Sequence, residues 1–395
     1  MRLAFVSPFV DRRHGTERAV AELLGRLAEN YGWEIHLYAE RVEDLAVSMT
    51  REVKNKNTGV IYWRRVPALP GPHIVRFVSW YVLNRWCRAW DRIVHGVNLD
   101  LVCSAGINCP DALLIVVHVV FHRLAELQRN SWASGFRAWH RWLYYRTLCA
   151  LEYRLYRDPR VGLAAVSRHT AKQLSLYFGR RDVSVSPYGV DTKFFHPGAL
   201  VSLRDAARRR WKFTPHEMIL LLIGNDWRNK GLPALLEAAS LCRDLPLRLL
   251  IVGQDNPAPF VSNARQLNLL DRVTFASPSA DILSFYAAAD VLVSPSLEDS
   301  FNLPCLEAMA CGLPVILSPN AGISEWVQSG TNAVLLADPR DSVELAGAIR
   351  ALLADPEHRR QLGENARRTA ATLTWDQHAK NIHELLCSRL NFASF

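Results

Sequence analysis

The sequence predicts an α/β protein built from two doubly wound, Rossmann-like domains, and three observations lead to this fold class. The chain has 395 residues, which at about 100–200 residues per domain suggests two domains. Short, continuous apolar runs recur, as expected for the strands of parallel sheets that are buried on both faces. Helical stretches separate these runs, and the whole series occurs twice.

Each run predicts one strand of a sheet. The strands expected in the first half are Leu3–Ser7, Ile35–Ala39, Leu101–Ser104, Leu113–Val120 and Leu163–Ser167. Those expected in the second half are Met218–Gly224, Leu247–Gly253, Val273–Ala276, Val291–Ser294, Pro314–Ser318 and Ala333–Leu336. Gly189 and Pro197 mark the join, which predicts domains over residues 1–195 and 196–375 and a last segment over 376–395. Ligands of open parallel sheets bind at the carboxyl ends of the strands, so the active site is expected in a cleft between the two domains.

The net charge of +9 is unevenly distributed. Residues 1–195 hold 28 Lys and Arg against 17 Asp and Glu, together with eight of the twelve Trp. This asymmetry predicts either an anionic partner for the first half or a solubilising, Arg-rich surface. No nucleic-acid-binding signature accompanies it, so nucleic acid is not expected as a partner. The eight Cys form no C-x-x-C pair, and the chain has neither a signal-peptide pattern nor an apolar run of about 18 residues. We therefore expect a cytoplasmic protein, with any membrane contact peripheral and on the inner face.

The most informative motif runs from Leu292 to Val315 and reads as strand, polar loop, short helix and next strand. Pro304 suits the first turn of a helix, and Gly312 suits its end. The backbone N–H groups of the Phe301–Leu303 region should therefore lie at a helix N-terminus, which favours phosphate or sugar hydroxyls. Asp299 and Glu307 lie eight residues apart in this motif, and carboxylates of this kind can accept two hydrogen bonds from a sugar diol.

The second motif, Leu221 to Leu232, opens the second series of strands. Gly231 lets the chain turn into a helix, and Lys230 is the only lysine between Lys212 and Lys380. A fixed cation at this position would stabilise the negative charge that develops on a departing nucleoside diphosphate. Two solvated loop cations are the alternative interpretation.

Together these motifs resemble the family-four retaining glycosyltransferases, also called glycosyl transferases group 1, which have the GT-B fold. The resemblance implies that Glu307 holds the donor ribose, that Asp299 faces the donor sugar, and that the backbone of Asn302 and Leu303 meets sugar or phosphate. It implies that Lys230 binds the diphosphate. Asp299 stands where the family has Glu, and Asn225 stands at the usual Arg position, so Arg228 is expected to supply the second cation. In relatives the last segment crosses back onto the first domain, which is expected here for 376–395.

Two features of the first half add to the predicted site. Gly15 follows the first strand and resembles the family's glycine loop beside the donor, with His14 in place of the first Gly. His118 ends an apolar run and matches the position of a histidine near the transferred sugar. His122 is four residues further on, but no metal-binding motif surrounds the pair and no D-x-D occurs. We therefore predict a metal-independent site that needs no cofactor besides its donor substrate.

Between Thr50 and Arg160 the chain is rich in Trp and Arg. Helical spacing places Trp80, Leu83, Cys87, Trp90 and Val94 on one face with Arg85, Arg88 and Arg92 opposite. A second stripe holds Trp132, Phe136, Trp139 and Leu143, with Arg137 and Arg141 turned away. Either these stripes face the core, or Trp and Arg touch an anionic membrane surface that carries a lipid-linked acceptor.

The function expected from the resemblance is transfer of a hexose-type sugar, with retention, from a UDP- or GDP-linked donor to a glycan or lipid-linked acceptor. Synthesis of a cell-envelope polysaccharide or glycolipid would use such a reaction. Two alternatives remain open, since fold alone does not define activity. One is a sugar-nucleotide epimerase or hydrolase on the same scaffold, and the other is a non-catalytic protein that binds sugar nucleotides or glycans.

Overall fold

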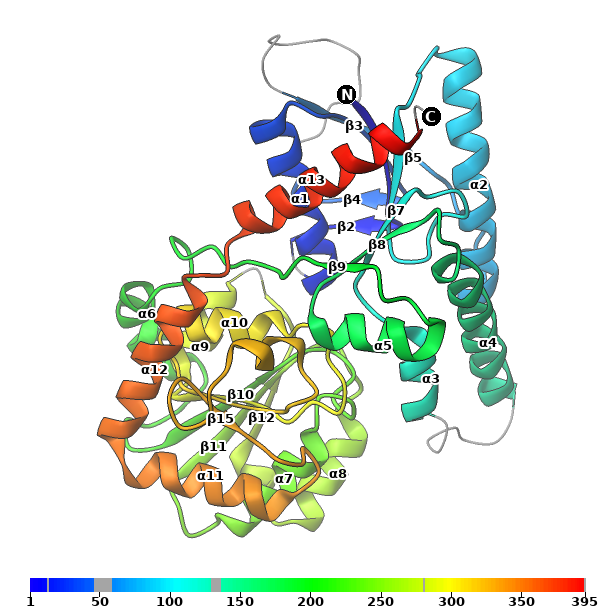
Figure 1. Cartoon of the computed structure of the whole chain (residues 1–395). Coiled ribbons are helices and arrows are strands. Elements are labelled where there is room, and N and C mark those ends of the chain that lie inside the picture. Colours follow the sequence, from blue (N-terminus) through cyan, green and yellow to red (C-terminus); the bar gives the residue numbers. More distant parts are fainter. Residues whose placement is uncertain (13, 46–58, 129–135, 280, 394–395) are drawn as a thin grey trace. The chain divides into compact units, whose positions relative to one another are not determined.

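The computed structural model describes residues 1–12, 14–45, 59–128, 136–279 and 281–393, and the chain divides into two compact units (Figure 1). Unit 1 comprises Met1–Pro187 and Trp375–Phe395, and unit 2 comprises Tyr188–Thr374. Both are parallel α/β units, as the recurrent apolar runs predicted. Among the described residues, no helix has the length and apolar character needed to span a membrane.

Unit 1 is built on a seven-stranded parallel sheet in the order β5-β3-β1-β6-β7-β8-β9. Its strands are β1 (Arg2–Val6), β3 (Glu34–Ala39), β5 (Val60–Arg65), β6 (Leu101–Ala105), β7 (Leu114–Val117), β8 (Gly162–Ala165) and β9 (Val183–Val185), beside a small pair, β2 (Phe9–Val10) and β4 (Arg41–Val42). Its helices are α1 (Gly15–Tyr31), α2 (His73–Val94), α3 (Phe121–Gln128), α4 (Phe136–Tyr156), α5 (Arg168–Phe178) and α13 (Trp375–Ala393). The central strands are almost wholly buried, as continuous apolar sequence requires.

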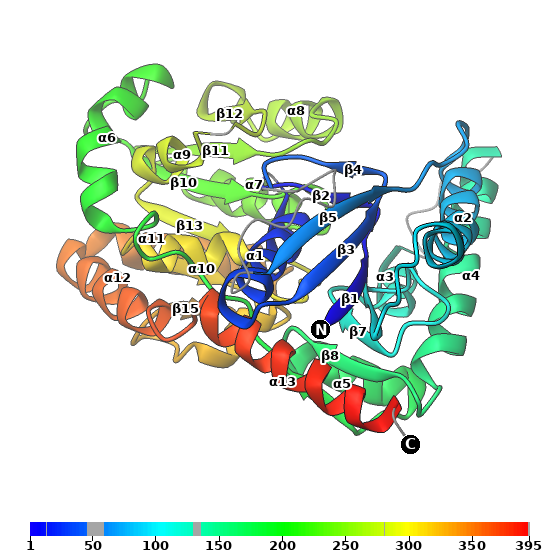
Figure 2. The same cartoon turned by 90° about the horizontal axis from the view of Figure 1, so that it is seen from above.

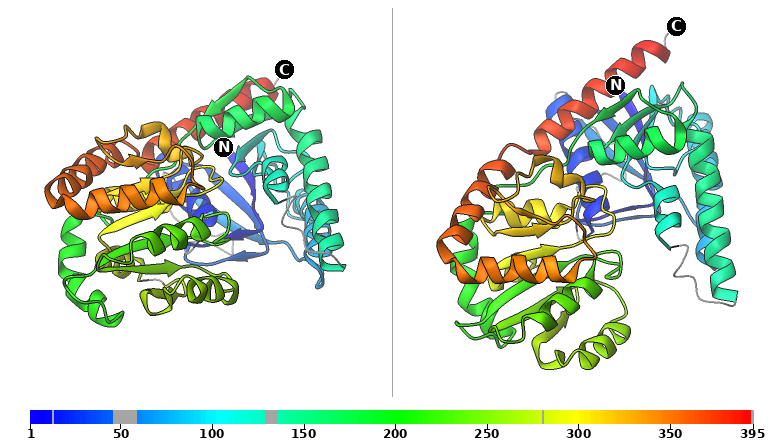
Figure 3. Two further views of the ribbon diagram at one scale, coloured as in Figure 1. Left: turned by 90° about the horizontal axis from the view of Figure 1, so that it is seen from below. Right: turned by 60° about the horizontal axis from the view of Figure 1, so that its bottom comes forward.

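Unit 2 repeats this plan with a six-stranded parallel sheet in the order β12-β11-β10-β13-β14-β15. Its strands are β10 (Met218–Ile223), β11 (Leu247–Val252), β12 (Val273–Ala276), β13 (Val291–Ser294), β14 (Val315–Leu317) and β15 (Val334–Leu335). Its helices are α6 (Pro197–Arg210), α7 (Leu232–Leu241), α8 (Ala258–Gln266), α9 (Ile282–Ala288), α10 (Leu303–Ala310), α11 (Ser342–Ala354) and α12 (Pro356–Ala370). Figure 3 shows α11 and α12, in orange, beside the strands of this sheet.

The boundary between the units differs from the predicted join at 195/196. The segment after Pro187 belongs to unit 2 because Tyr188 packs on Phe301, with ring centroids 5.1 Å apart, and the Val190 N–H donates to the Leu373 carbonyl at 3.0 Å. The last helix, α13, begins at Trp375 and belongs to unit 1, where it packs against α1. Four strands had no counterpart among the predicted strands: β5 and β9 of the unit 1 sheet, and the small pair β2 and β4. Strands β5 and β9 lie at the two edges of the unit 1 sheet, where half-buried residues interrupt the apolar run.

The aromatic stripe predicted on α2 is wrong in its second half. Trp80 is buried, but Trp90 is 63% and Val94 51% exposed. The buried face instead continues through Asn84, Arg88 and Asp91, about one residue out of phase with the prediction. Each of these polar groups has a partner in the fold: Arg88 binds Asp111 at 2.7 and 2.9 Å, and Asp91 accepts a hydrogen bond from Tyr38 at 2.8 Å.

The second predicted stripe is only partly described by the structure. Trp132 lies outside the described residues, and the side chains of Phe136 and Arg137 are likewise outside the described part. Of the remainder, Leu143 is half-buried, whereas Trp139 is 55% exposed and therefore does not face the core. Helices α2 and α4 lie side by side (Figure 2), and Phe77 contacts Tyr144 between them with ring centroids 6.4 Å apart.

Unit 1 should lose stability in mild acid, because it buries two histidines in the neutral form. Burial, with a smaller contribution from nearby Arg26, lowers the pKa of His378 to about 4, and burial, with a smaller contribution from nearby His378, lowers the pKa of His118 to about 3. An unfolded histidine takes up its proton near pH 6.5. Between about pH 6.5 and 4 the unfolded state therefore binds more protons than the folded state, and the stability of unit 1 decreases as the pH decreases. The loss is about 1.4 kcal/mol per pH unit for each histidine.

Calorimetric melting temperatures measured from pH 7 to 5 check this expectation. His378→Asn should flatten the decline, whereas His216→Asn, at an exposed position of unit 2, should leave it unchanged. A His378→Asn variant with the same pH slope as the parent protein would contradict the assignment.

Candidate functional site

The two motifs of the second half meet at the carboxyl ends of two central strands of the unit 2 sheet. The first follows β13 and the second follows β10, and these strands are neighbours in the parallel sheet. The strand order reverses between them, since β11 and β12 continue on one side and β14 and β15 on the other. Such a switch point is where open α/β sheets bind ligands, outside the carboxyl ends of their strands.

Lys230 and Asp299 form an ion pair at the carboxyl ends of these strands. The Lys230 Nζ lies 2.5 Å from the Asp299 Oδ2, and both side chains are largely buried, with exposed fractions of 17% and 13%. The lysine stem passes over Gly224, where a Cβ atom would lie 2.7 Å from the Lys230 Cε. Gly231, at a φ of +79°, starts α7 so close to the Pro295 carbonyl that a Cβ atom would lie 2.0 Å from its oxygen. The glycines of the second motif are therefore required by space as well as by backbone conformation.

Asn229 joins the two motif loops, which sequence analysis did not predict. Its carbonyl accepts the Leu297 N–H at 2.7 Å, and its side-chain Nδ2 donates to the Glu298 carbonyl at 2.8 Å. These two bonds hold the loop after β10 against the loop after β13, and so fix the position of Lys230 beside Asp299. No local pattern signals this role, because the partners are separated by almost seventy positions in the chain.

Asn225, which departs from the family pattern, and Arg228, which is expected to supply the missing cation, have different surroundings. The Asn225 Oδ1 accepts the Gln254 N–H at 2.8 Å, so this side chain ties the loop after β10 to the loop after β11. Arg228 is exposed, and within the described residues its guanidinium makes no ion pair or hydrogen bond. Arg228 therefore has its donors available for an anion, whereas the oxygen of Asn225 is already engaged in the fold.

The helix start predicted in the first motif is confirmed, with one correction. Helix α10 begins at Leu303, with Pro304 in its first turn and Asn302 as its N-cap. The N–H groups of Asn302 and Leu303 make no hydrogen bond to any residue that the structure describes. The Phe301 N–H differs from the expectation, because it donates to the Asp299 Oδ1 at 3.3 Å. Two backbone donors, rather than three, are thus available at this helix N-terminus.

The strained backbone of this loop favours an asparagine at position 302. It has a φ of +78°, a left-handed conformation that asparagine tolerates better than most residues. Its Oδ1 caps α10 by accepting the Cys305 N–H at 3.3 Å, and its Nδ2 donates to the Ser294 Oγ at 2.7 Å. The side chain of Asn302 thus shapes the loop, and only its backbone can meet a ligand as the resemblance implies.

Glu307 lies within α10 and is 2% exposed. Its Oε2 accepts a hydrogen bond from the Tyr286 hydroxyl at 2.6 Å, and Tyr286 comes from α9. A buried carboxylate needs such donors to stay charged, so Tyr286 is a positioning residue for Glu307. Sequence analysis missed it, because a tyrosine in an apolar helix reads as core.

Gly15 and His118 both lie in unit 1. Gly15 is the first residue of α1, and the preceding His14 is its N-cap residue. The His14 Nδ1 lies 2.9 Å from the buried Asp11 carboxylate, a pair that the glycine-loop pattern did not indicate. His118 directly follows β7, at the carboxyl end of that strand as predicted. Its lowered pKa keeps its imidazole neutral at neutral pH.

His122 belongs to a group with Cys149 and Glu152 whose ligand atoms lie within 4.8 Å of one another. The buried Glu152 accepts the backbone N–H groups of Phe121 and His122 at 2.6 and 3.0 Å, and its Oε2 lies 2.8 Å from the His122 Nδ1. These bonds identify Glu152 as the cap of α3. His118 is not part of this group, so the pairing of His118 with His122 as ligands is not formed in the structure.

Three comparisons with known proteins agree with the geometry. Residues 204–369 match the family model described as glycosyl transferases group 1. The D-inositol 3-phosphate glycosyltransferase of Rhodococcus erythropolis is 32% identical over 238 residues, which are 56% of this chain and 52% of that protein. The enzyme of the same name from Geodermatophilus obscurus is 36% identical over 231 residues, covering 54% and 50%. The chain thus spans about half the length of the curated relatives that it matches.

Solved structures match over nearly the whole chain. WaaG, a glycosyltransferase involved in lipopolysaccharide biosynthesis, superposes with a TM-score of 0.79 at 20% identity, covering 97% of this chain and 99% of that one. Sucrose-phosphate synthase from Thermosynechococcus elongatus gives a TM-score of 0.78 at 22% identity over 100% of both chains. HepE of Anabaena in complex with UDP and glucose gives 0.69 at 19% identity, covering 98% and 100%. The chain has the GT-B fold, and its residues 204–369, which contain both motifs, match the model of the glycosyl transferases group 1 family.

Proposed function

We propose that this chain is a retaining glycosyltransferase that moves a hexose-type sugar from a UDP- or GDP-linked donor to a glycan or lipid-linked acceptor. The observation that supports this most is the Lys230–Asp299 pair at the switch point of unit 2, whose residues 204–369 match a glycosyltransferase family model. HepE, which shares the fold, was solved with UDP and glucose and with UDP-glucose. This makes UDP-glucose the first donor to test.

In the proposed mechanism unit 2 holds the donor. Lys230 and Arg228 stabilise the negative charge that grows on the leaving diphosphate. The N–H groups of Asn302 and Leu303 bind phosphate or sugar oxygens at the start of α10, while Glu307 holds the ribose hydroxyls. Asp299 and His118 position the sugar, and Gly15 gives the backbone room to approach it. The departing phosphate helps to deprotonate the acceptor, so no protein base is assigned.

A thermal-shift screen of UDP, GDP, ADP and CMP tests the donor site. A ligand that binds only the folded state raises the melting temperature, by an amount corresponding to about 2.7 kcal/mol at a hundredfold excess over Kd. We expect one nucleoside diphosphate to stabilise the wild type and to lose this effect in Lys230→Ala. The same shift in both proteins would contradict the site.

Turnover then separates the alternatives to transfer. Donor conversion without any acceptor would indicate an epimerase or a hydrolase, and tight donor binding with no product for any acceptor would indicate a non-catalytic relative. Because the curated relatives are named D-inositol 3-phosphate glycosyltransferases, D-inositol 3-phosphate is a natural first acceptor to try beside glycans and lipid-linked sugars.

We also propose that unit 1 contacts an anionic membrane surface from the cytoplasmic side. The outer face of α2 carries an exposed apolar stripe, which we call the α2 stripe: Val75, Val78, Val82, Trp86, Trp90 and Ile93. Its most exposed members are Ile93 and Trp86, whose exposed fractions are 80% and 69%. Exposed arginines also occur on α2 and on the neighbouring helix α4, namely Arg76, Arg85, Arg92, Arg141 and Arg146. Apolar and basic side chains combined on one surface favour the interface of an anionic bilayer.

Flotation with liposomes tests this contact. We expect binding to vesicles that contain anionic lipid and little binding to purely zwitterionic vesicles. The double variant Trp86→Ser, Trp90→Ser should bind on the order of tenfold more weakly. Val343→Ser, which removes an equally exposed apolar side chain from unit 2, is the matched control and should bind as the parent does. Absence of binding to anionic vesicles would refute the proposal.

A further inference from the structure

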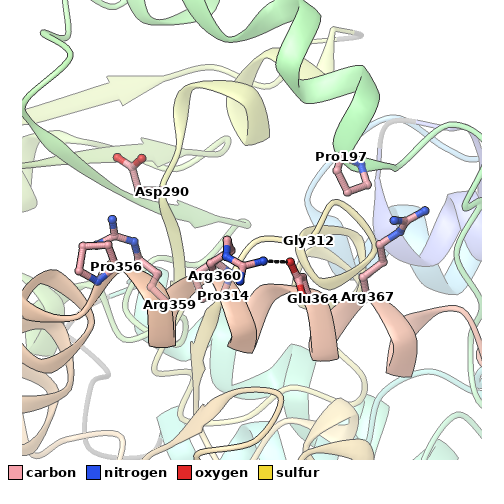
Figure 4. Close-up of a pocket in the computed structure, with 9 residues that line it drawn as sticks. All are labelled: Pro197, Asp290, Gly312, Pro314, Pro356, Arg359, Arg360, Glu364 and Arg367. Carbon is pink, nitrogen blue, oxygen red and sulfur yellow. Dashed lines mark hydrogen bonds and ion pairs between the residues drawn. The ribbon is translucent and has the colours of Figure 1, made fainter.

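A pocket of about 480 Å³, shown in Figure 4, is lined by residues of unit 2. Asp290 and Pro314, which line it, directly precede β13 and β14. In a parallel sheet such residues lie at the amino ends of the strands, whereas Lys230 and Asp299 follow β10 and β13 at the carboxyl ends. The pocket and the candidate donor site therefore lie at opposite ends of the strands of this sheet.

Three prolines and two closely packed helices form the walls of this pocket. Pro197 at the start of α6, Pro314 before β14 and Pro356 at the start of α12 line it. Helix α12 packs closely on the end of α10, because a Cβ atom on Gly363 would lie 2.1 Å from the Gly312 carbonyl oxygen. The volume of the cavity lies within the range of small-molecule sites.

Three arginines of α12, namely Arg359, Arg360 and Arg367, supply the positive charge of the lining. The two acids in the lining already have partners. Asp290 pairs with Arg204 and Arg208 and accepts the Ile219 N–H at 2.7 Å.

Glu364, the second acid, pairs with Arg360 in Figure 4, and Arg360 also binds Glu357 at 2.6 Å. Arg360 is therefore neutralised by the acids of its own helix. The acidic residues of the lining therefore do not neutralise the positive charges of Arg359 and Arg367.

Arg359 and Arg367 keep donors for a ligand. Arg359 uses its Nη1 to bind the Leu352 carbonyl at 2.7 Å, which leaves most of its five N–H donors. Arg367 makes no side-chain hydrogen bond or ion pair with any residue in the described ranges. Guanidinium groups match the oxygens of a phosphate with two parallel hydrogen bonds. Arg359 and Arg367 are eight positions apart on α12, so their Cα atoms lie roughly 12 Å apart along the helix axis, and a ligand that contacts both needs anionic groups at two ends.

We propose that this pocket binds a small phosphorylated metabolite, with Arg359 and Arg367 each holding phosphate oxygens. The site is distinct from the donor site, and it does not depend on the transferase reaction. Helix α10 runs between the two ends of the strands, beginning at the Asn302 cap and ending beside Gly312.

Calorimetric titration with fructose 1,6-bisphosphate as the probe tests this site. We expect the wild type to bind it, Arg367→Gln to bind it at least about tenfold more weakly, and Arg359→Gln combined with Arg367→Gln to lose binding. Arg368→Gln is the matched control, because Arg368 is the next residue of α12, is exposed and does not line the pocket. Arg367→Gln removes no hydrogen bond or ion pair among the described residues, so it should fold as the parent does, which its melting temperature verifies.

Lys230→Ala separates this site from the donor site. Undiminished binding of the probe by Lys230→Ala supports the pocket, whether or not the chain proves to be a transferase. The proposal is overturned if the wild type fails to bind the probe at millimolar concentration. It is equally overturned if Lys230→Ala abolishes binding while the arginine variants retain it.

Discussion

Replacing Lys230 with alanine is expected to lower the kcat of sugar transfer by about 100- to 1000-fold, the usual effect of removing one fixed group that stabilises developing charge. The lysine is held at one position by Asp299, at 2.5 Å, and its stem lies against Gly224. Its charge therefore requires little reorganisation when the diphosphate begins to leave. Alanine also leaves the Asp299 carboxylate largely buried without its cation, and this negative charge would repel the diphosphate.

Steady-state kinetics with the donor found in the thermal screen measures this effect. Lys380→Ala, at an exposed lysine of α13, is the control and should keep full activity. Asp299→Asn should lose less than Lys230→Ala, because it leaves the cation in place. A Lys230→Ala variant that keeps more than about a tenth of the parent kcat would remove Lys230 from the mechanism.

Replacing Glu307 with glutamine should weaken binding of the nucleoside diphosphate by roughly 10- to 100-fold, the equivalent of about 1.5–3 kcal/mol for hydrogen bonds to a charged group. The side chain is nearly isosteric, so the packing of the buried α10 face is preserved. What changes is the charge of the acceptor that the ribose hydroxyls would meet. Because the ribose belongs to the nucleotide, the loss should appear with UDP or GDP alone, without the sugar.

Tyr286→Phe is the matched control for this measurement. It removes the hydroxyl that binds the Glu307 Oε2 at 2.6 Å and leaves the carboxylate itself. Nucleotide affinity should fall less than in Glu307→Gln, since the carboxylate keeps its charge but loses part of its orientation. Equal affinity of Glu307→Gln and the parent protein would show that Glu307 supports the fold of α10 only.

The sequence by itself determined those features that depend on neighbouring residues. Continuous apolar runs predicted the central strands, because a strand buried on both faces needs apolar side chains throughout. Pro304 marked the start of α10, since a proline fits the first turn, where no N–H is donated. The same local signals identified Lys230, Asp299 and Glu307, and the two motifs carried the family resemblance that the comparisons confirm.

Only the tertiary structure decided which of these residues meet. Lys230 lies beside Asp299 because β10 and β13 are adjacent in the sheet, and Asn229 ties their loops together. The inward face of α2 was predicted wrongly because Arg88 and Asp91 are buried against partners on other elements, Asp111 and Tyr38. The arginine pocket had no local signal, since helices α6 and α12 and the starts of two strands build it together. A helical or strand period reports only whether a residue can face inward, whereas the partner that makes burial favourable comes from a distant part of the chain.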